Sequence, residues 1–189
     1  MPYAIVKPWM QTYSGKKFDL LEPTQESIDI NDIAHALSNL CRYTGHTEHF
    51  YSVAQHSIIA AANVPEENKL CALLHDATEA YINDISRPLK ALLPEYRKIE
   101  DRIWHEIADK FYLPYEMPES IKKADIRLLA TEKRDLLTVE PDEWTIINDV
   151  EPYPEKIEFL DNETVKERFL NIFKEYSHQN KISCKETIR

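Results

Sequence analysis

Residues 70–82 of the chain read Leu-Cys-Ala-Leu-Leu-His-Asp-Ala-Thr-Glu-Ala-Tyr-Ile, an apolar helical pattern that also carries an imidazole and two carboxylates. His75 and Glu79 are four residues apart and Asp76 and Glu79 are three apart, so a helix would place all three side chains along one edge. Two carboxylates beside an imidazole repel each other unless a positive charge lies among them, and a divalent cation would supply that charge. The alternative interpretation is an acidic patch at the solvent-exposed edge of a structural helix.

The composition predicts the architecture around this stretch. The 189 residues are 43% hydrophobic and 30% charged, which is typical of one globular domain rather than a disordered chain. Only two glycines are present, so neither a dinucleotide-binding fingerprint nor a P-loop can be written, and helices are favoured. We therefore expect an all-α domain over residues 1–189, with a small β-hairpin extension over residues 1–30 and a flexible tail over residues 177–189.

Charge and cysteine content exclude several classes of protein. The chain has 23 Lys and Arg against 33 Asp and Glu, a net charge of −10, which argues against binding to the phosphate backbone of nucleic acids. No apolar run approaches the roughly 18 residues of a membrane span, and the first residues lack the apolar core of a signal peptide. Three scattered cysteines are too few for a disulfide framework or a thiolate zinc cage. These observations predict a cytoplasmic protein that binds neither nucleic acid nor membranes.

Local patterns predict the individual elements. Residues 11–21 favour a hairpin around the turn at Ser14-Gly15, and Asn31 is the expected N-cap of the first helix. Apolar periodicity and capping residues predict six helices. Their expected ranges are residues 31–41, 47–63, 65–81, 94–112, 121–139 and 164–176. A loop is expected at residues 83–88, and the proline-rich residues 142–161 are assigned no element.

Two further residues can complete a ligand set around the first stretch. His56 lies on the preceding predicted helix, and a turn at Val64-Pro65 would make the two helices antiparallel and bring His56 close to His75. Asp125 lies just inside another apolar helix, on the same face as Glu132 seven residues later. Each has a structural interpretation by itself, as a hydrogen-bonded core histidine or a surface carboxylate. Together with the His-Asp pair of the first stretch, they form a set of two nitrogen and two oxygen ligands.

The order of these residues resembles a known signature. His56, then His75-Asp76, then Asp125 is similar to the H…HD…D pattern of the HD-domain metal-dependent phosphohydrolases. Residues 75–79, HDATE, followed by residues 83–90, NDISRPLK, resemble the HD[AS]xE…D[LI]xxPxK stretch of the bacterial 5′-deoxynucleotidase branch. The resemblance covers residues 39–137, about half of the chain, and implies an HD-domain helical bundle.

The segment before His56 shares further features with that family. Arg42-Tyr43 lies fourteen residues before His56, the spacing at which the deoxynucleotidase branch carries an Arg followed by an aromatic residue. Tyr43 stands where those enzymes usually have Trp. The run Tyr-Ser-Val-Ala-Gln-His-Ser at residues 51–57 is more similar to small phage and prophage HD hydrolases. His46 and His49, in the connection between Arg42 and His56, are expected to be structural or to support the metal ligands rather than to bind the metal ion.

The resemblance implies one divalent metal ion with four protein ligands. Those ligands would be His56, His75, Asp76 and Asp125. Mixed nitrogen and oxygen ligands suit Mn²⁺, Co²⁺, Fe²⁺, Ni²⁺ or Zn²⁺ better than Mg²⁺, which prefers an all-oxygen shell. The expected cofactor is therefore one divalent transition metal ion.

The resemblance also implies roles for the residues around the metal. Glu79 would orient or deprotonate the attacking water, and Asp84 would hydrogen-bond that water or protonate the leaving oxygen. Arg42 would bind the phosphate bidentately, and Tyr43 would stack on the sugar or the base. Lys90 is a second candidate for the phosphate, and its alternative interpretation is a solvated lysine after a loop.

The predicted activity is hydrolysis of deoxynucleoside 5′-monophosphates to deoxynucleosides and phosphate, with the nucleotide as a small-molecule substrate. One alternative is a deoxynucleoside triphosphate phosphohydrolase of the phage type. An alternative of another class is a non-catalytic sensor that binds a nucleotide, against which the proton-transfer candidates Glu79 and Asp84 argue. The family also favours a homodimer.

Overall fold

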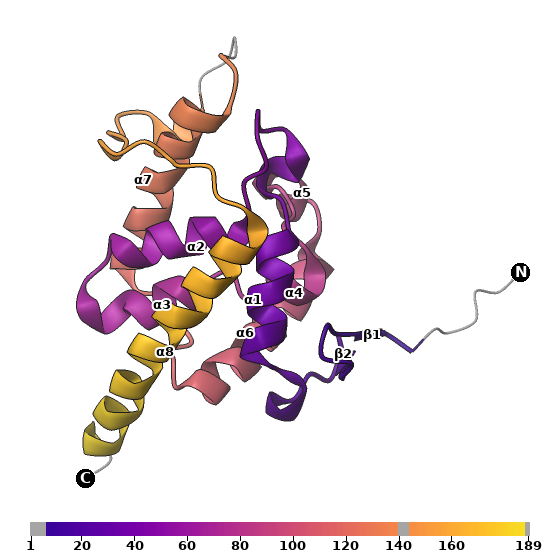
Figure 1. Cartoon of the computed structure of the whole chain (residues 1–189). Helices are drawn as coiled ribbons and strands as arrows, with labels where there is room; N and C mark the ends of the chain where they lie inside the picture. The colour runs from indigo at the N-terminus through magenta and orange to yellow at the C-terminus, as the bar shows by residue number, and fades with distance from the viewer. Residues whose placement is uncertain (1–6, 140–143, 188–189) are drawn as a thin grey trace, which may run out of the picture.

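The structure is a computed structural model that describes residues 7–139 and 144–187 (Figure 1). It is mostly helical, with one small antiparallel sheet near the N-terminus, which confirms the all-α class with a β-hairpin. The α-helices are α1 (Ile30–Asn39), α2 (Val53–Ala62), α3 (Lys69–Leu74), α4 (Glu79–Ile82), α5 (Arg87–Ala91), α6 (Pro94–Phe111), α7 (Glu119–Leu136) and α8 (Asn162–Thr187). None of them, over the described residues, is long and apolar enough to span a membrane.

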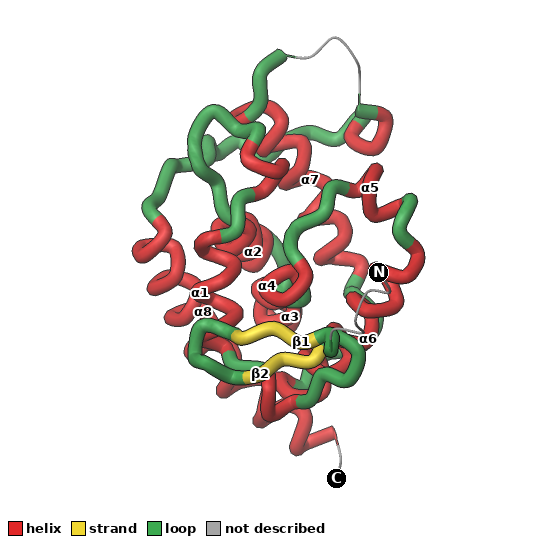
Figure 2. The backbone as a smooth tube through the Cα atoms, turned by 90° about the vertical axis from the view of Figure 1, so that its right-hand side faces the viewer, coloured by secondary structure: helices red, strands yellow, loops and turns green. Residues whose placement is uncertain are grey.

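The hairpin is anchored to the helical core. Strands β1 (Trp9–Gln11) and β2 (Lys17–Asp19) pair antiparallel, and Gly15 adopts a left-handed φ of 85° in the turn between them. Phe18 is 0% exposed and its ring stacks on Tyr81 of α4 at a centroid distance of 3.8 Å. Figure 2 shows the two strands lying beside α4. The sheet therefore contributes an aromatic side chain to the main core.

The first two helices begin at residues other than those predicted. Asp29, rather than Asn31, is the N-cap of α1, because its carboxylate accepts a hydrogen bond from the Asn31 backbone N–H. The second helix is predicted from residue 47, but α2 begins at Val53, with Ser52 as its N-cap. Residues 47–52 belong instead to the connection between α1 and α2. In this connection the backbone N–H of Arg42 donates to the carbonyl oxygen of Tyr51.

The predicted helix over residues 65–81 is interrupted. It divides into a short 3₁₀ turn (Glu66–Asn68), α3 and α4. Between α3 and α4 the backbone N–H of Ala77 donates to Leu74, and that of Glu79 donates to Asp76. These hydrogen bonds join residues that are three apart instead of four, so the backbone is wound more tightly than in an α-helix. His75 and Asp76 therefore lie in a turn and not along the edge of a continuous helix.

The later helices follow the sequence pattern with different ends. α6 begins at Pro94 as expected, and α7 covers most of the predicted range 121–139. Part of the predicted loop at residues 83–88 belongs to α5, which begins at Arg87. The last predicted helix ends at residue 176, but α8 continues as helix to Thr187, and no Pro or Gly interrupts its sequence. Of residues 142–161, the first two lie outside the described residues, and Thr145–Ile147 form a 3₁₀ turn.

Helix α2 occupies the centre of the helical arrangement. It packs against α1, α3, α7 and α8, and Figure 1 shows it crossing between α7 and α8. Consequently residues 53–57 are all buried, His56 among them. This burial brings the central histidine next to the α3–α4 turn and to α7, the two other elements that carry the predicted ligands.

Candidate metal centre

The structure brings the four predicted metal ligands together from three elements. Nε2 of His56 in α2 lies 3.2 Å from Oδ1 of Asp125 in α7 and 3.6 Å from Oδ2 of Asp76. Nε2 of His75 lies 3.3 Å from the same Asp76 oxygen. His56, His75 and Asp125 each offer one ligand atom within 4.8 Å of the others, so this group could hold a metal ion.

Both histidines are oriented through their other ring nitrogen. Nδ1 of His56 is 2.6 Å from Oε1 of Glu132, and Nδ1 of His75 is 2.7 Å from the carbonyl oxygen of Ala72. Because both partners are acceptors, each Nδ1 must carry the proton, which leaves Nε2 to face the carboxylates. Neither buried Nε2 has a hydrogen-bond partner among residues 7–139 and 144–187. A divalent cation fits this donor set, since it would engage both nitrogens and the carboxylates between them.

The electrostatics of the site require positive charge at its centre. Burial and the charge of Arg42 oppose protonation of His56, but Glu132 and Asp125 outweigh them and raise the pKa of His56 to about 9. Burial acts to raise the pKa of Asp125, yet the close contact with His56 and the charge of that ring hold the pKa of Asp125 below its usual range. The carboxylates that stabilise the proton on His56 would therefore stabilise a bound cation in the same way.

Glu132 is a buried member of the site for which the sequence predicted no role. Its side chain is 0% exposed, and it contacts His56, Arg42 and Tyr43. Burial acts to raise the pKa of Glu132, but the charges of Arg42 and His56 lower it to about 2. The only signal in the sequence was its spacing of seven residues from Asp125 on an apolar helix.

Arg42 and Tyr43 enter the site from a strained connection. Tyr43 and Thr44 have left-handed φ angles of 55° and 54°, followed by Gly45 at 81°. The Arg42 guanidinium reaches Oε2 of Glu132 at 3.2 Å and Oδ2 of Asp76 at 3.5 Å. The Tyr43 hydroxyl donates to the same Glu132 oxygen at 2.5 Å. The unusual backbone thus directs two consecutive side chains to one buried carboxylate.

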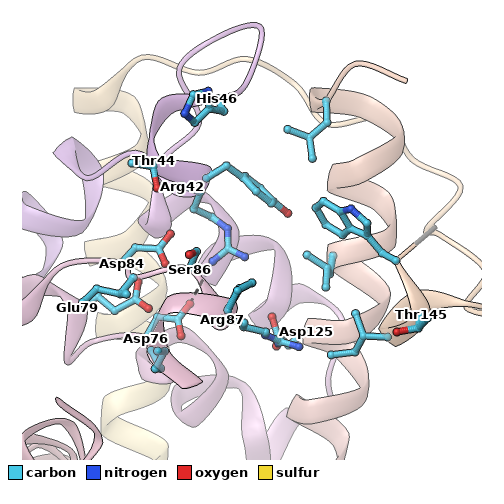
Figure 3. Close-up of a pocket in the computed structure, with 18 residues that line it drawn as sticks. Arg42, Thr44, His46, Asp76, Glu79, Asp84, Ser86, Arg87, Asp125 and Thr145 are labelled. Atoms are coloured by element: carbon cyan, nitrogen blue, oxygen red, sulfur yellow. Dashed lines mark hydrogen bonds and ion pairs between the residues drawn. The ribbon is translucent and has the colours of Figure 1, made fainter. Parts of the chain in front are cut away.

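A pocket of about 980 Å³ is lined by two of the candidate ligands, Asp76 and Asp125. Its lining includes all the predicted catalytic and substrate-binding residues: Arg42, Tyr43, Glu79, Asp84 and Lys90. Figure 3 shows Arg42 reaching toward Asp76, with Glu79 and Asp84 on one side and Arg87 and Asp125 on the other. The predicted substrate residues therefore share one cavity with two of the candidate metal ligands, Asp76 and Asp125.

Two carboxyl groups in the pocket have raised pKa values. Burial raises the pKa of Glu79 well above its ordinary value, and the charges of Asp76 and Asp84 add to this effect. Burial also raises the pKa of Asp84, against the opposing charge of Arg42. Oε2 of Glu79 is buried without a hydrogen-bond partner in the described part of the chain. Both groups consequently hold their protons to higher pH than ordinary carboxyl groups.

The other pocket cations are held by carboxylates. Lys90 Nζ lies 2.7 Å from Oε1 of Glu100, and Arg87 NH2 lies 2.6 Å from Oδ2 of Asp125. Lys90, for which the sequence allows two interpretations, lies in the pocket lining with its ammonium group paired to Glu100. Arg87 links the pocket wall directly to a candidate metal ligand.

Sequence reasoning missed several lining residues. His46, for which the sequence predicted no substrate contact, lines the pocket, whereas the ring of His49 packs against Phe159 at a centroid distance of 4.3 Å. Trp144 and Ile146 complete an apolar wall, and the Trp144 ring lies 6.4 Å from that of Tyr43. These two residues come from the proline-rich segment that was assigned no element, and no local pattern marked them.

Comparison with known proteins identifies relatives of this chain. No family model matches the sequence. The chain is 46% identical over 142 residues to "Uncharacterized protein YfdR" of Escherichia coli (strain K12), covering 75% of this chain and 80% of that protein. It is 39% identical over 128 residues to "Uncharacterized protein RCAP_rcc00048" of Rhodobacter capsulatus, covering 62% of this chain and 65% of that protein. At this identity and coverage, the chain belongs to the family of E. coli YfdR.

Proposed function

We propose that this chain is a metal-dependent phosphohydrolase of nucleotides, with deoxynucleoside 5′-monophosphates as the leading substrates. One arrangement carries the proposal: two histidines with their Nδ1 atoms hydrogen-bonded direct their Nε2 atoms at two carboxylates below a pocket. The same pocket is lined by buried carboxyl groups and by cations, which proton transfer and phosphate binding require.

The proposed ligands of the metal ion are His56, His75, Asp76 and Asp125. This set of imidazole and carboxylate groups favours Mn²⁺, Co²⁺, Fe²⁺, Ni²⁺ or Zn²⁺. A divalent cation held there would polarise a phosphoryl oxygen and lower the pKa of a water molecule.

Other pocket residues carry out proton transfer, phosphate binding and nucleoside stacking. Glu79 takes the proton of the attacking water, and Asp84 gives a proton to the leaving oxygen, since burial raises the pKa of both groups. The Arg42 guanidinium binds the phosphate oxygens through its planar fork of N–H donors. Tyr43 and Trp144 form the wall on which the nucleoside stacks.

The charges of the pocket favour a monophosphate over a triphosphate. Among the described lining residues, three cations (Arg42, Arg87 and Lys90) face four carboxyl groups (Asp76, Glu79, Asp84 and Asp125). Adding one divalent cation leaves an excess of one positive charge when all four carboxyl groups are ionised, and of two when Asp84 holds the proton that it donates. That excess suits the two negative charges of a phosphate monoester better than the roughly four charges of a triphosphate.

A phosphate-release screen tests the proposal. The purified protein is stripped of metal, reloaded separately with Mn²⁺, Co²⁺ or Mg²⁺, and given ribo- and deoxynucleoside mono- and triphosphates, with products resolved by chromatography. His75→Ala, purified in the same way, controls for contaminating phosphatases. We expect selective turnover of deoxynucleoside monophosphates by the wild type only.

Other outcomes would replace the proposal. Turnover of triphosphates alone would favour the alternative triphosphate phosphohydrolase. Nucleotide binding without turnover under any metal would instead identify a sensor and overturn both enzymatic hypotheses.

A further inference from the structure

We infer that Glu132 is a positioning residue that joins two halves of the site. The metal-binding half contains His56, and the phosphate-binding half contains Arg42 and Tyr43. The inference rests on the proposed function for the roles of His56 and Arg42, and its own support is the geometry of one carboxylate. Oε1 of Glu132 lies 2.6 Å from Nδ1 of His56. Oε2 accepts from Arg42 at 3.2 Å and from the Tyr43 hydroxyl at 2.5 Å. Each oxygen thus serves one half of the site.

The burial of Glu132 fixes which partners each of its two carboxylate oxygens binds. The side chain is 0% exposed, so no bulk water can replace a lost partner. An ionised carboxylate is an acceptor only, and His56, Arg42 and Tyr43 all donate to it. A buried carboxylate with this set of donors holds each of them in one orientation.

Asp135, a second acidic residue on α7, is a carboxylate with structural partners and serves as a comparison. The side chain of Asp135 is only 3% exposed and is also paired with an arginine, Arg134, at 2.7 Å. It accepts a further hydrogen bond from the backbone N–H of Ile157. None of the partners described for Asp135 lines the pocket, whereas Glu132 contacts the candidate metal ligand His56 and the pocket residues Arg42 and Tyr43. The two residues therefore provide a matched pair.

Glutamine at position 132 would satisfy only one half of the site. If its amide oxygen faces His56, its NH₂ group faces the donors Arg42 and Tyr43 and cannot accept from them. If the amide is turned, its NH₂ group faces Nδ1 of His56 and favours the tautomer that carries its proton on Nε2. In that tautomer Nε2 has no lone pair for a metal ion. The substitution keeps the size of the side chain, so it separates hydrogen-bond direction from packing.

Metal titration of the wild type, Glu132→Gln and Asp135→Asn tests the inference. Co²⁺ is the probe, with its visible absorption reporting the ligand geometry and competition with a chelator giving the dissociation constant. Outer partners of metal-binding histidines typically contribute about 10- to 100-fold to affinity. We expect a loss of that size and an altered spectrum for Glu132→Gln, and the wild-type affinity and spectrum for Asp135→Asn even if its melting temperature falls.

The phosphate-binding half is read out separately with inorganic phosphate. Each variant is first saturated with Co²⁺, and the dissociation constant of phosphate is measured from the change in the visible spectrum. We expect weaker phosphate binding by Glu132→Gln than by Asp135→Asn, because the amide cannot hold Arg42 and His56 at the same time. Wild-type affinity of Glu132→Gln for both Co²⁺ and phosphate would overturn the inference and leave the proposed function standing.

A measurement on the wild type covers the case in which Glu132→Gln does not fold. Nitrogen-15 NMR of the Zn²⁺-loaded protein reports which nitrogen of each histidine ring carries a proton. We expect His56 to carry its proton on Nδ1, and a proton on Nε2 would overturn the inference. Failure of the wild type to bind any metal ion would overturn the proposed metal site together with this inference, an outcome distinct from equal binding by the wild type and Glu132→Gln.

Discussion

Nε2 of His56 lies 3.2 Å from Oδ1 of Asp125, and the two residues belong to different helices, α2 and α7. The imidazole is completely buried, and the surrounding carboxylates raise its pKa to about 9 against the effects of burial and of Arg42. The contact has a measurable consequence, because a metal ion can bind Nε2 only after the proton has left.

Metal affinity is therefore expected to depend on pH. Below about pH 9 the proton on His56 competes with the metal ion, so the affinity should rise by about tenfold per pH unit between pH 6.5 and 8.5 and level off above pH 9. Calorimetric titration with Mn²⁺ in buffers of different ionisation enthalpy would measure about one proton released per metal ion at pH 7.5. Affinity that is constant over this range, with no proton release, would show that His56 is neutral before the metal binds.

Glu79→Gln should separate catalysis from metal binding. The amide cannot accept the proton of the attacking water, so we expect kcat to fall by about 10²–10⁴-fold with unchanged metal content. Glu79 is buried and its Oε2 has no hydrogen-bond partner among the described residues, so the variant should unfold at the wild-type temperature or above it. Turnover, bound metal and thermal unfolding are measured on one preparation. Unchanged turnover would remove Glu79 from the mechanism.

Arg42→Lys should weaken substrate binding although it keeps the charge. The ammonium group lacks the planar fork that contacts two phosphate oxygens, and the loss of one charged hydrogen bond corresponds to about 1.5–3 kcal/mol, or about 10- to 100-fold in KM. Arg127→Lys is the matched control, because the Arg127 guanidinium bonds the backbone carbonyls of Glu151 and Pro152 outside the pocket. Equal KM values in the two variants would assign Arg42 a structural role.

Thr44→Gly is expected to stabilise the fold. Thr44 has a φ of 54°, in a region that is unfavourable for a β-branched residue but open to glycine. Relief of this strain, less the greater chain entropy of glycine, corresponds to about 0.5–1 kcal/mol in the free energy of unfolding. Urea unfolding of the wild type, Thr44→Gly and Thr44→Ala would measure it. A larger gain for alanine than for glycine would contradict the strain argument.

Phe18→Ala tests whether the hairpin belongs to the core. Phe18 is 0% exposed and stacks on Tyr81, and truncation of a buried phenylalanine to alanine costs about 3–5 kcal/mol. Trp9→Ala on the facing strand provides the control, since Trp9 is 48% exposed. We expect a large loss in the free energy of unfolding for Phe18→Ala and a small one for Trp9→Ala. Similar small losses for both would show that the hairpin is dispensable for stability.

The sequence alone determined the helical class and the identity of the four candidate ligands. Few glycines, helical periodicity and proline at residue 94 act over short distances, so they predict α6 and most of α7 directly. The order of His56, His75-Asp76 and Asp125 is likewise a property of the chain. Three boundaries differ from the prediction: the break between α3 and α4, the later start of α2 and the continuation of α8 beyond residue 176.

Only the tertiary structure decided how the site is held together. Glu132 contacts His56 and Arg42 because α2 packs against α7 and the left-handed backbone at Tyr43 turns the connection before α2 toward the same point. Trp144 reaches the pocket from a segment without helical periodicity. These contacts join residues distant in the sequence, and no local pattern encodes them, because their formation depends on which helix faces are buried against each other.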